Sequence, residues 1–182
     1  MSGLEPDLVA RAQRGDASAF GCLYERYLER IYRYVYYRVS DHHEAEDLTE
    51  TVFLKAWEAL PRFRVKGSTF GAWLYRIAHN TVVDRHRTQR ASLPLSEALD
   101  VRDGEAHSPE AVAEAEQEST WLHTALSRLE PRLQEVILNR FVNGLSHRET
   151  AGVMGLGEGH VRVLQHRALR EMRDTLTEEL TL

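Results

Sequence analysis

The sequence predicts an all-α protein: two small helical domains joined by an acidic flexible linker, with a C-terminal helix-turn-helix. Apolar residues recur at three- and four-residue steps in both halves of the chain, and no alternating strand pattern of useful length appears. The stretch 91–120 combines many acidic residues with Pro, Gly and Ser and shows little apolar periodicity, which is typical of a solvated linker. We therefore expect domains at residues 4–90 and 121–177.

Two helices are predicted to begin the first domain. A short one runs from Leu8 to Arg14 and stops near Gly15, and Asp16 is placed to cap a long second helix. The apolar residues of the second helix form a single stripe: Phe20, Leu23, Tyr24, Tyr27, Ile31, Tyr34 and Val35. A stripe on one side predicts that this side packs into a core.

Two more helices are predicted to complete the first domain. The third spans about His42 to Leu60 and is ended by Pro61. Its inward positions are Ala45, Leu48, Val52, Ala56 and Trp57. After the loop "RFRVKGST", Ser68 or Thr69 caps a fourth helix that begins near Phe70. The inward stripe of the fourth helix is Phe70, Trp73, Leu74, Ile77 and Thr81.

The second domain is predicted to begin with a helix over residues 121–129. Pro131 suits the first turn of the next helix, which runs to about Asn143. Ser146 and Glu149 fit the S-x-x-E capping box, which opens a short helix.

A helix-turn-helix is predicted to close the second domain. Gly155 and Gly157 mark the turn, and the last main helix covers residues 158–172. Its buried side is expected to hold Val161, Leu164 and Ala168, which step by three and four. Its outer side then holds His160, Arg162, Val163, His166 and Arg167. Arginine reads guanine or holds phosphate and valine meets a thymine methyl, so duplex DNA is one expected ligand; a plain helical hairpin with a solvated basic face is the alternative.

Composition narrows the classes of function. The 182 residues are 42% hydrophobic, and no apolar run approaches the roughly 20 residues that span a bilayer. The N-terminus lacks the layout of a signal peptide, and the single cysteine, Cys22, permits no internal disulfide, so a cytoplasmic location is expected. The net charge of −5 conceals a basic stretch at 62–90 between acidic stretches at 41–50 and 91–120.

The basic stretch fits single-stranded nucleic acid. On the fourth helix, Arg76, Asn80, Asp84 and Arg87 share a polar face, and the basic loop before it has aromatic residues interleaved. A structural role is the favoured interpretation of the aromatics, but an asparagine is a poor helix former and a good reader of base edges.

The acidic third helix shows neither a basic partner nor metal-site spacing in the sequence. A set of His43, Glu46, Asp47 and Glu50 could hold a metal, but there is no HExxH pattern, and an enzyme would also lack a nucleophile and a phosphate loop. We therefore expect no catalytic residue, metal or cofactor. An acidic helix face indicates either solvent or a basic protein partner.

Three segments in order resemble the extracytoplasmic-function (group IV) sigma factors of bacterial RNA polymerase: "EAEDLTETVFLKAW", "FRVKGSTFGAWLYRIAHNTVVDRHR" and "LSHRETAGVMGLGEGHVRVLQHRAL". The resemblance runs from about Leu4 to Arg173. It implies sigma region 2 at 4–90 and region 4 at 121–177, in a factor that binds core RNA polymerase and directs promoter-specific initiation. It also implies an anti-sigma factor as a partner, and no membrane contact of the chain's own.

The resemblance assigns residues to three surfaces. The surface that docks on the clamp helices of the polymerase would comprise Asp47, Leu48, Thr49, Glu50 and Phe53. The −10 element, read as single-stranded DNA with a flipped base, would contact Lys66, Ser68, Arg76, Asn80 and Arg87. The −35 element, read as duplex, would contact Ser146, His160, Arg162, Val163, His166 and Arg167.

Several positions depart from the family pattern. Glu50 stands where glutamine is common and Thr51 where an acid is common, while Gly157 stands where Ser or Thr usually caps the recognition helix. His160, Val163 and Leu164 also replace commoner residues, so no promoter sequence transfers from relatives. The alternative function is an autonomous helix-turn-helix regulator that acts without polymerase, but such a regulator needs neither an acidic docking helix nor a single-strand reader.

Overall fold

The computed structural model describes residues 4–64, 69–92 and 122–179, and its regular structure consists of helices. No strand occurs among these residues, and the all-α prediction is confirmed. The chain divides into two compact units, which we describe separately. Among the helices of the described ranges, none has the length and apolar character needed to cross a membrane.

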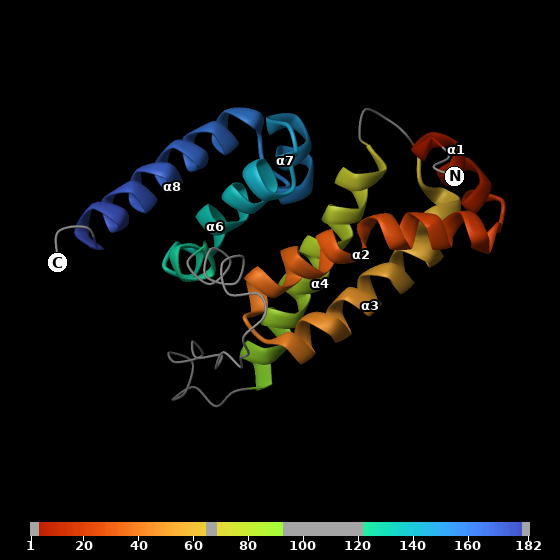
Figure 1. Cartoon of the computed structure of the whole chain (residues 1–182), viewed down its shortest axis with the longest axis horizontal. Coiled ribbons are helices and arrows are strands. Elements are labelled where there is room, and N and C mark those ends of the chain that lie inside the picture. Colours follow the sequence, from red (N-terminus) through yellow and green to blue (C-terminus); the bar gives the residue numbers. More distant parts are fainter. Residues whose placement is uncertain (1–3, 65–68, 93–121, 180–182) are drawn as a thin grey trace, which may run out of the picture. The chain divides into compact units, whose positions relative to one another are not determined.

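The N-terminal unit consists of four helices and a short 3-10 turn (Figure 1). Asp16 caps the second helix as predicted, because its Oδ1 accepts a hydrogen bond of 3.0 Å from the Ala19 backbone N–H. Gly15, with φ +91°, makes the turn before it. The elements are α1 (Glu5–Gln13), α2 (Ala17–Val39), α3 (His42–Ala59), η1 (Leu60–Arg62) and α4 (Phe70–Ser92).

The core of this unit lies between α2, α3 and α4. Tyr34 and Tyr75 meet edge to face with ring centroids 5.6 Å apart, and both side chains are fully buried. Burial raises the pKa of the Tyr75 hydroxyl to about 12, so this group stays protonated. Trp57 differs from the prediction, because its side chain is 38% exposed and packs only at the edge, 4.8 Å from the Phe20 ring. It lies about 100° around the helix from the buried Ala56, which takes it off the inward face.

The start of α4 packs tightly against α2. The Tyr27 hydroxyl donates a hydrogen bond of 2.7 Å to Glu5 of α1, and its ring lies 5.6 Å from that of Phe70. Burial, and then the contact with Glu5, raise the pKa of the Tyr27 hydroxyl well above its usual value. A Cβ on Gly71 would lie only 2.9 Å from the Tyr27 hydroxyl oxygen. This position therefore requires a residue without a side chain.

Replacing Gly71 with alanine is expected to lower the free energy of unfolding by about 1–3 kcal/mol, because the new methyl group must displace a buried tyrosine that is hydrogen-bonded to Glu5. Urea denaturation of the full chain measures the change. Gly21→Ala is the matched control, since nothing lies within 4 Å of the Cβ it adds in α2, and it should stabilise by about 0.5–1 kcal/mol. Equal behaviour of the two variants would contradict the packing argument.

The C-terminal unit contains a helix at 122–127 and a series of helices that follow it. They are α6 (Pro131–Ile137), η2 (Leu138–Val142), α7 (His147–Met154) and α8 (Glu158–Glu179). Its core includes Leu126, Leu133, Val136, Leu138, Val161 and Ala168, all fully buried. The last helix continues past the predicted end at Met172.

One predicted helix of this unit is wrong in its second half. An α-helix was expected from Pro131 to about Asn143, but the chain turns into a π-helix at η2, where the Asn143 N–H bonds to the Leu138 carbonyl at 2.8 Å. The Leu145 N–H bonds to the Asn139 carbonyl, and Gly144 follows the turn with φ +69°. The wider turn leaves Phe141 exposed.

Candidate functional site

The helix-turn-helix predicted from the capping signal is present in α7 and α8. The Ser146 hydroxyl accepts a hydrogen bond from the Glu149 N–H at 3.1 Å, and the Glu149 carboxylate accepts one from the Ser146 N–H at 2.9 Å. Gly155, with φ +66°, ends α7. Ala151, expected from its small size to allow close packing, is buried. The Ser146 hydroxyl also donates to the Glu149 carboxylate. The hydroxyl that was predicted to contact DNA therefore caps the start of α7.

The outer face of α8 is the face that the sequence predicted. Val161, Leu164 and Ala168 are buried, as their spacing indicated. The five α8 residues among the six assigned to the −35 element are all exposed: His160, Arg162, Val163, His166 and Arg167. Val163 is 66% exposed, so its methyl groups are available to contact a thymine methyl in a groove.

The arginines of α8 form ion pairs that the sequence analysis did not anticipate. Arg162 lies 3.6 Å from Glu158 one turn earlier, and Arg167 lies 2.8 Å from Glu171 and 3.8 Å from Glu130. Such exposed pairs contribute little to stability, about 0–1 kcal/mol, so a phosphate or a guanine can take over the guanidinium.

Arg140 was missed by the sequence analysis, and it connects three parts of the C-terminal unit. Its Nε donates to the Gln165 side chain of α8 at 3.0 Å, and its Nη1 donates to the Leu145 carbonyl just before the capping box. The guanidinium therefore joins η2 and the loop before α7 to the middle of α8. The sequence does place Arg140 shortly before a turn at Gly144, where an arginine can bond to a free carbonyl. It does not show which carbonyl the guanidinium reaches.

The polar face of α4 is exposed as predicted. Arg76, Asn80, Asp84 and Arg87 all face solvent, and Arg87 lies 3.2 Å from Asp84. Phe70 is buried against Tyr27 and other rings, so its role is structural, as favoured from the sequence. Thr69 caps the helix by accepting a bond of 3.2 Å from the Ala72 N–H. Two further residues assigned to the −10 element, Lys66 and Ser68, lie outside the described residues.

The residues assigned to the docking surface on α3 divide into two groups. Asp47 and Glu50 are exposed. Leu48, Thr49 and Phe53 are buried within the unit, so they present little surface of their own. The Thr49 hydroxyl bonds to the Ala45 carbonyl at 2.6 Å and the Phe53 ring packs 4.7 Å from Tyr24, so these side chains hold α3 against the unit.

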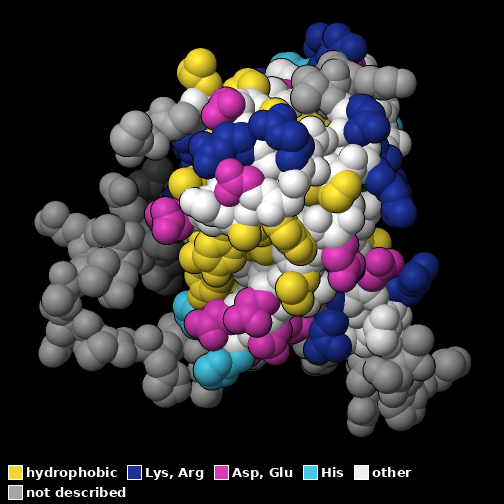
Figure 2. Space-filling model, turned by 90° about the vertical axis from the view of Figure 1, so that its right-hand side faces the viewer, with side chains coloured by type: hydrophobic (Ala, Val, Ile, Leu, Met, Phe, Trp, Pro, Cys, Tyr) yellow, Lys and Arg dark blue, Asp and Glu magenta, His cyan; other side chains and the backbone are white. Residues whose placement is uncertain are grey.

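Two apolar residues of α3 that the sequence analysis did not assign to the docking surface are exposed there. Leu54 is 65% exposed, and Trp57 lies one turn further along α3. Asp47, Glu50 and Leu54 step by three and four, so they lie along one face of the helix with Trp57. Figure 2 shows hydrophobic side chains gathered in a band with acidic side chains along one edge and basic side chains along the other.

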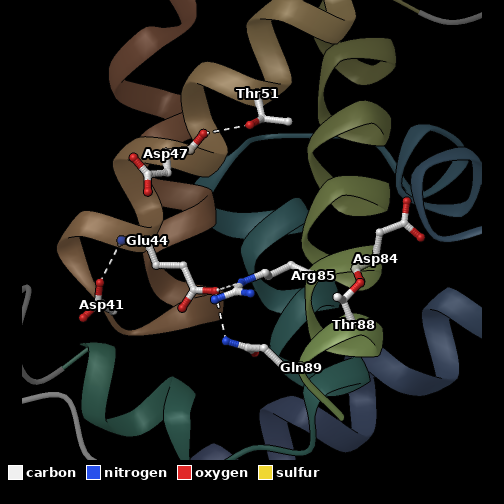
Figure 3. A network of polar contacts seen from close by, with 8 residues as sticks. All are labelled: Asp41, Glu44, Asp47, Thr51, Asp84, Arg85, Thr88 and Gln89. Atoms are coloured by element: carbon white, nitrogen blue, oxygen red, sulfur yellow. Dashed lines mark hydrogen bonds and ion pairs between the residues drawn. The ribbon is translucent and has the colours of Figure 1, made fainter. Parts of the chain in front are cut away.

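The acids of α3 are not all unpaired, which corrects one expectation. The Glu44 carboxylate accepts a bond of 2.6 Å from Arg85 and one of 3.3 Å from Gln89, both on α4 (Figure 3). Within the described ranges, Asp47 and Glu50 have no ion-pair partner. The same ranges contain no group of three or more His, Cys, Asp or Glu residues arranged to hold a metal. The acidic charge available to a partner therefore lies beside Leu54 and Trp57.

Comparison with protein families matches both units. The model for Sigma-70 region 2 matches residues 23–92, and the model for Sigma-70, region 4 matches residues 125–174. The ECF RNA polymerase sigma factor BldN of Streptomyces coelicolor is 42% identical over 175 residues, 95% of this chain and 66% of that protein. The ECF RNA polymerase sigma factor SigD of Mycobacterium tuberculosis is 35% identical over 174 residues, 93% of this chain and 82% of that protein.

Solved structures share the fold over most of the chain. CnrH, in complex with the cytosolic domain of CnrY, has a TM-score of 0.72 and 26% identity and covers 94% of this chain and 96% of its own. The sigma factor RpoE of Bartonella quintana, in complex with the anti-sigma factor NepR, has a TM-score of 0.75 and 23% identity, covering 87% of this chain and 96% of its own. The second likeness concerns the fold alone.

Proposed function

Since the chain belongs to the extracytoplasmic-function (ECF) sigma factors of the sigma-70 family, we infer that it binds core RNA polymerase and directs promoter-specific initiation of transcription. The observation that carries this inference is the presence on one chain, in order, of a region 2 and a region 4, the second with a basic helix-turn-helix. Members of this family are promoter-recognition subunits and not enzymes. We place the protein in the cytoplasm, where core polymerase and chromosomal DNA meet.

The exposed face of α3 is proposed to dock on core polymerase. Leu54 and Trp57 offer an apolar centre, and Asp47 and Glu50 an acidic flank without ion pairs in the described chain. An apolar centre with one sign of charge at its rim fits an amphipathic partner of the opposite charge, which the clamp helices of the largest subunit would supply. Buried Phe53 supports this face from beneath.

The exposed face of α4 is proposed to read the −10 element on the non-template strand. Arginines hold phosphates, and an amide reads a base edge once the base has left the stack. Arg76, Asn80 and Arg87 supply these groups over three turns, and Lys66 and Ser68 precede them in the chain. Flipping a base costs a few kcal/mol, so contacts on this face must offset that cost.

Region 4 is proposed to read the −35 element as duplex, with α8 in the major groove. We propose that region 2 covers 4–90 and region 4 covers 121–177, with 91–120 between them as linker. His160, Val163 and His166 would face base edges, and Arg162 and Arg167 would exchange their acidic partners for DNA. His160 and Val163 depart from the commoner family residues, so the −35 sequence is expected to differ from those of relatives.

Replacing Arg162 with alanine is expected to weaken binding to the −35 duplex by about 1–3 kcal/mol and to relax specificity at one or two base pairs, because the variant loses a guanidinium that can contact a base edge. The fold should not change, since within the protein this guanidinium pairs with the exposed Glu158. Arg173→Ala removes the same charge three turns further along α8 and should leave base discrimination unchanged. Competition binding with single-base variants of the −35 element measures both. Equal discrimination in the wild type and Arg162→Ala would remove this residue from the reading face.

We also propose that an anti-sigma protein controls this chain. CnrH was solved with the cytosolic domain of CnrY and has the fold of this chain at 26% identity. An anti-sigma protein that covers α3 would compete with core polymerase for Leu54 and Trp57.

The function is tested by mixing the purified chain with sigma-free core RNA polymerase and following co-elution in size-exclusion chromatography. The proposed function predicts a stable complex that initiates transcription on genomic DNA fragments on which core polymerase alone does not initiate. A folded chain that neither co-elutes with core nor supports transcription would overturn it. Duplex binding without polymerase in that case would favour the autonomous regulator.

A further inference from the structure

The last residue of α1 reaches across the N-terminal unit to the end of α3. The Gln13 side-chain amide donates two hydrogen bonds, one of 3.1 Å to the Leu60 carbonyl and one of 2.8 Å to the Phe63 carbonyl. These partners are 47 and 50 positions away in the sequence. Both hydrogens of one NH₂ group are therefore used on the backbone of a single turn.

The two carbonyls belong to the place where α3 ends. The 3-10 turn η1 starts at Leu60, and Phe63 is the residue that leaves it in extended conformation. Each carbonyl also has a donor nearby in the chain: the Phe63 N–H bonds to the Leu60 carbonyl at 3.0 Å, and the Arg64 guanidinium bonds to the Phe63 carbonyl at 3.1 Å. Gln13 is the second donor to each of them and the one that comes from another helix. The direction in which the chain leaves α3 is thus fixed from α1.

The same short helix also reaches the start of α4. Glu5, at the other end of α1, accepts the hydrogen bond of the Tyr27 hydroxyl, and the Tyr27 ring packs on Phe70 and fills the space at Gly71. Contacts from α1 therefore secure the last residues of η1 on one side and the first residues of α4 on the other. Arg76 and Asn80 lie within the first three turns of α4, after the residues that the second contact holds.

We propose that Gln13 is a positioning residue for −10 recognition: by tying the end of α3 to α1, it sets where α4 presents its base-reading side chains to single-stranded DNA. Gln13 itself makes no contact with DNA in this proposal. The inference rests on the proposed role of α4 as the −10 reader. The observation that supports it is that the Gln13 side chain, far away in the sequence, bonds to two backbone carbonyls where the chain leaves α3 toward α4.

Three variants separate positioning from mere stability. Gln13→Glu has nearly the same shape but removes both donors and places carboxylate oxygens against two carbonyl oxygens. Gln13→Lys restores a donor of similar reach. Arg14→Ala alters the exposed residue next to it and serves as the control.

The test uses the full chain in holoenzyme and a promoter fragment that the wild-type holoenzyme selects from genomic DNA. Permanganate reactivity of unpaired thymines measures the rate of opening of the −10 region. Gln13→Glu should open about tenfold more slowly, the order expected for two lost hydrogen bonds. Gln13→Lys should recover most of the rate, and Arg14→Ala should match the wild type. Core affinity and −35 duplex affinity should stay at wild-type values in all three variants. The loss of two hydrogen bonds should lower the unfolding midpoint of Gln13→Glu, so opening is measured at a temperature at which circular dichroism shows every variant fully folded.

The outcomes distinguish this inference from the proposed function. A wild-type holoenzyme that opens no DNA overturns the proposed function, and this inference falls with it. Opening at the wild-type rate by Gln13→Glu overturns the inference alone. A slow Gln13→Glu that Gln13→Lys does not rescue, or whose slower opening is matched by a smaller folded fraction at the assay temperature, also overturns it, because the residue would then act only on stability.

Discussion

The variant Asp47→Arg is expected to lose about a hundredfold or more in affinity for core RNA polymerase, because a like charge at a complementary interface costs several kcal/mol. Asp47 is exposed on α3 and has no ion-pair partner in the described chain, so its charge is free to act on a partner. It shares its helix face with Leu54, which is 65% exposed. Equilibrium titration of core polymerase into the labelled chain measures the loss.

The control for this variant makes the same change of charge on the neighbouring helix. Glu29 is exposed on the outer side of α2, so Glu29→Arg should bind core within a factor of about two of the wild type at physiological salt, where distant charges are screened. Circular dichroism should give the same helical content for both variants, since neither side chain is buried. If Asp47→Arg binds core as tightly as Glu29→Arg does, α3 is not the docking helix.

The helix ends that the sequence predicted best are those with a local signal. Asp16, Thr69 and Ser146 each accept a hydrogen bond from a backbone N–H three positions on, and this geometry needs no information from elsewhere in the chain. The first helix begins at Glu5, earlier than the predicted Leu8, because Pro6 suits a first turn and extends the helix toward the N-terminus.

The features that the sequence did not reveal depend on partners far away along the chain. Glu44 looked like one of several unpaired acids, but Arg85 meets it from 41 positions away. Gln13 reaches the end of α3 in the same way. Periodicity reports which side of a helix is buried and not which side chain of another helix lies opposite, so such pairs become visible only in three dimensions.

The candidate site was predictable to the extent that exposure follows helical spacing. The outer residues of α8 were identified because Val161, Leu164 and Ala168 define the opposite side. On α3 the motif resemblance assigned Leu48 and Phe53 to a contact surface, although both are buried. A motif records which residues a family retains, and it does not separate those that touch a partner from those that hold the helix in place. Leu54 was missed for the same reason.

Replacing Asn80 with alanine is expected to slow opening of the −10 region by about ten- to a hundredfold, since a base-edge contact by an amide contributes roughly 1–3 kcal/mol of discrimination. Asn80 is exposed on α4, and alanine is the better helix former by up to about 0.7 kcal/mol, so the fold should become slightly more stable. A slower rate together with an unchanged or higher unfolding midpoint would separate DNA reading from stability. Permanganate footprinting on a promoter that the holoenzyme selects gives the rate.

Pairing the protein change with a DNA change identifies the base that Asn80 reads. An abasic site introduced at each −10 position in turn should abolish the difference between wild type and Asn80→Ala at one position only, because there the contact is already missing. Thr88→Ala, which removes another exposed polar group two turns along α4, should show no such coupling. If the defect of Asn80→Ala persists at every abasic position, the amide reads no base. The α4 face would then act on the phosphates alone, through Arg76 and Arg87.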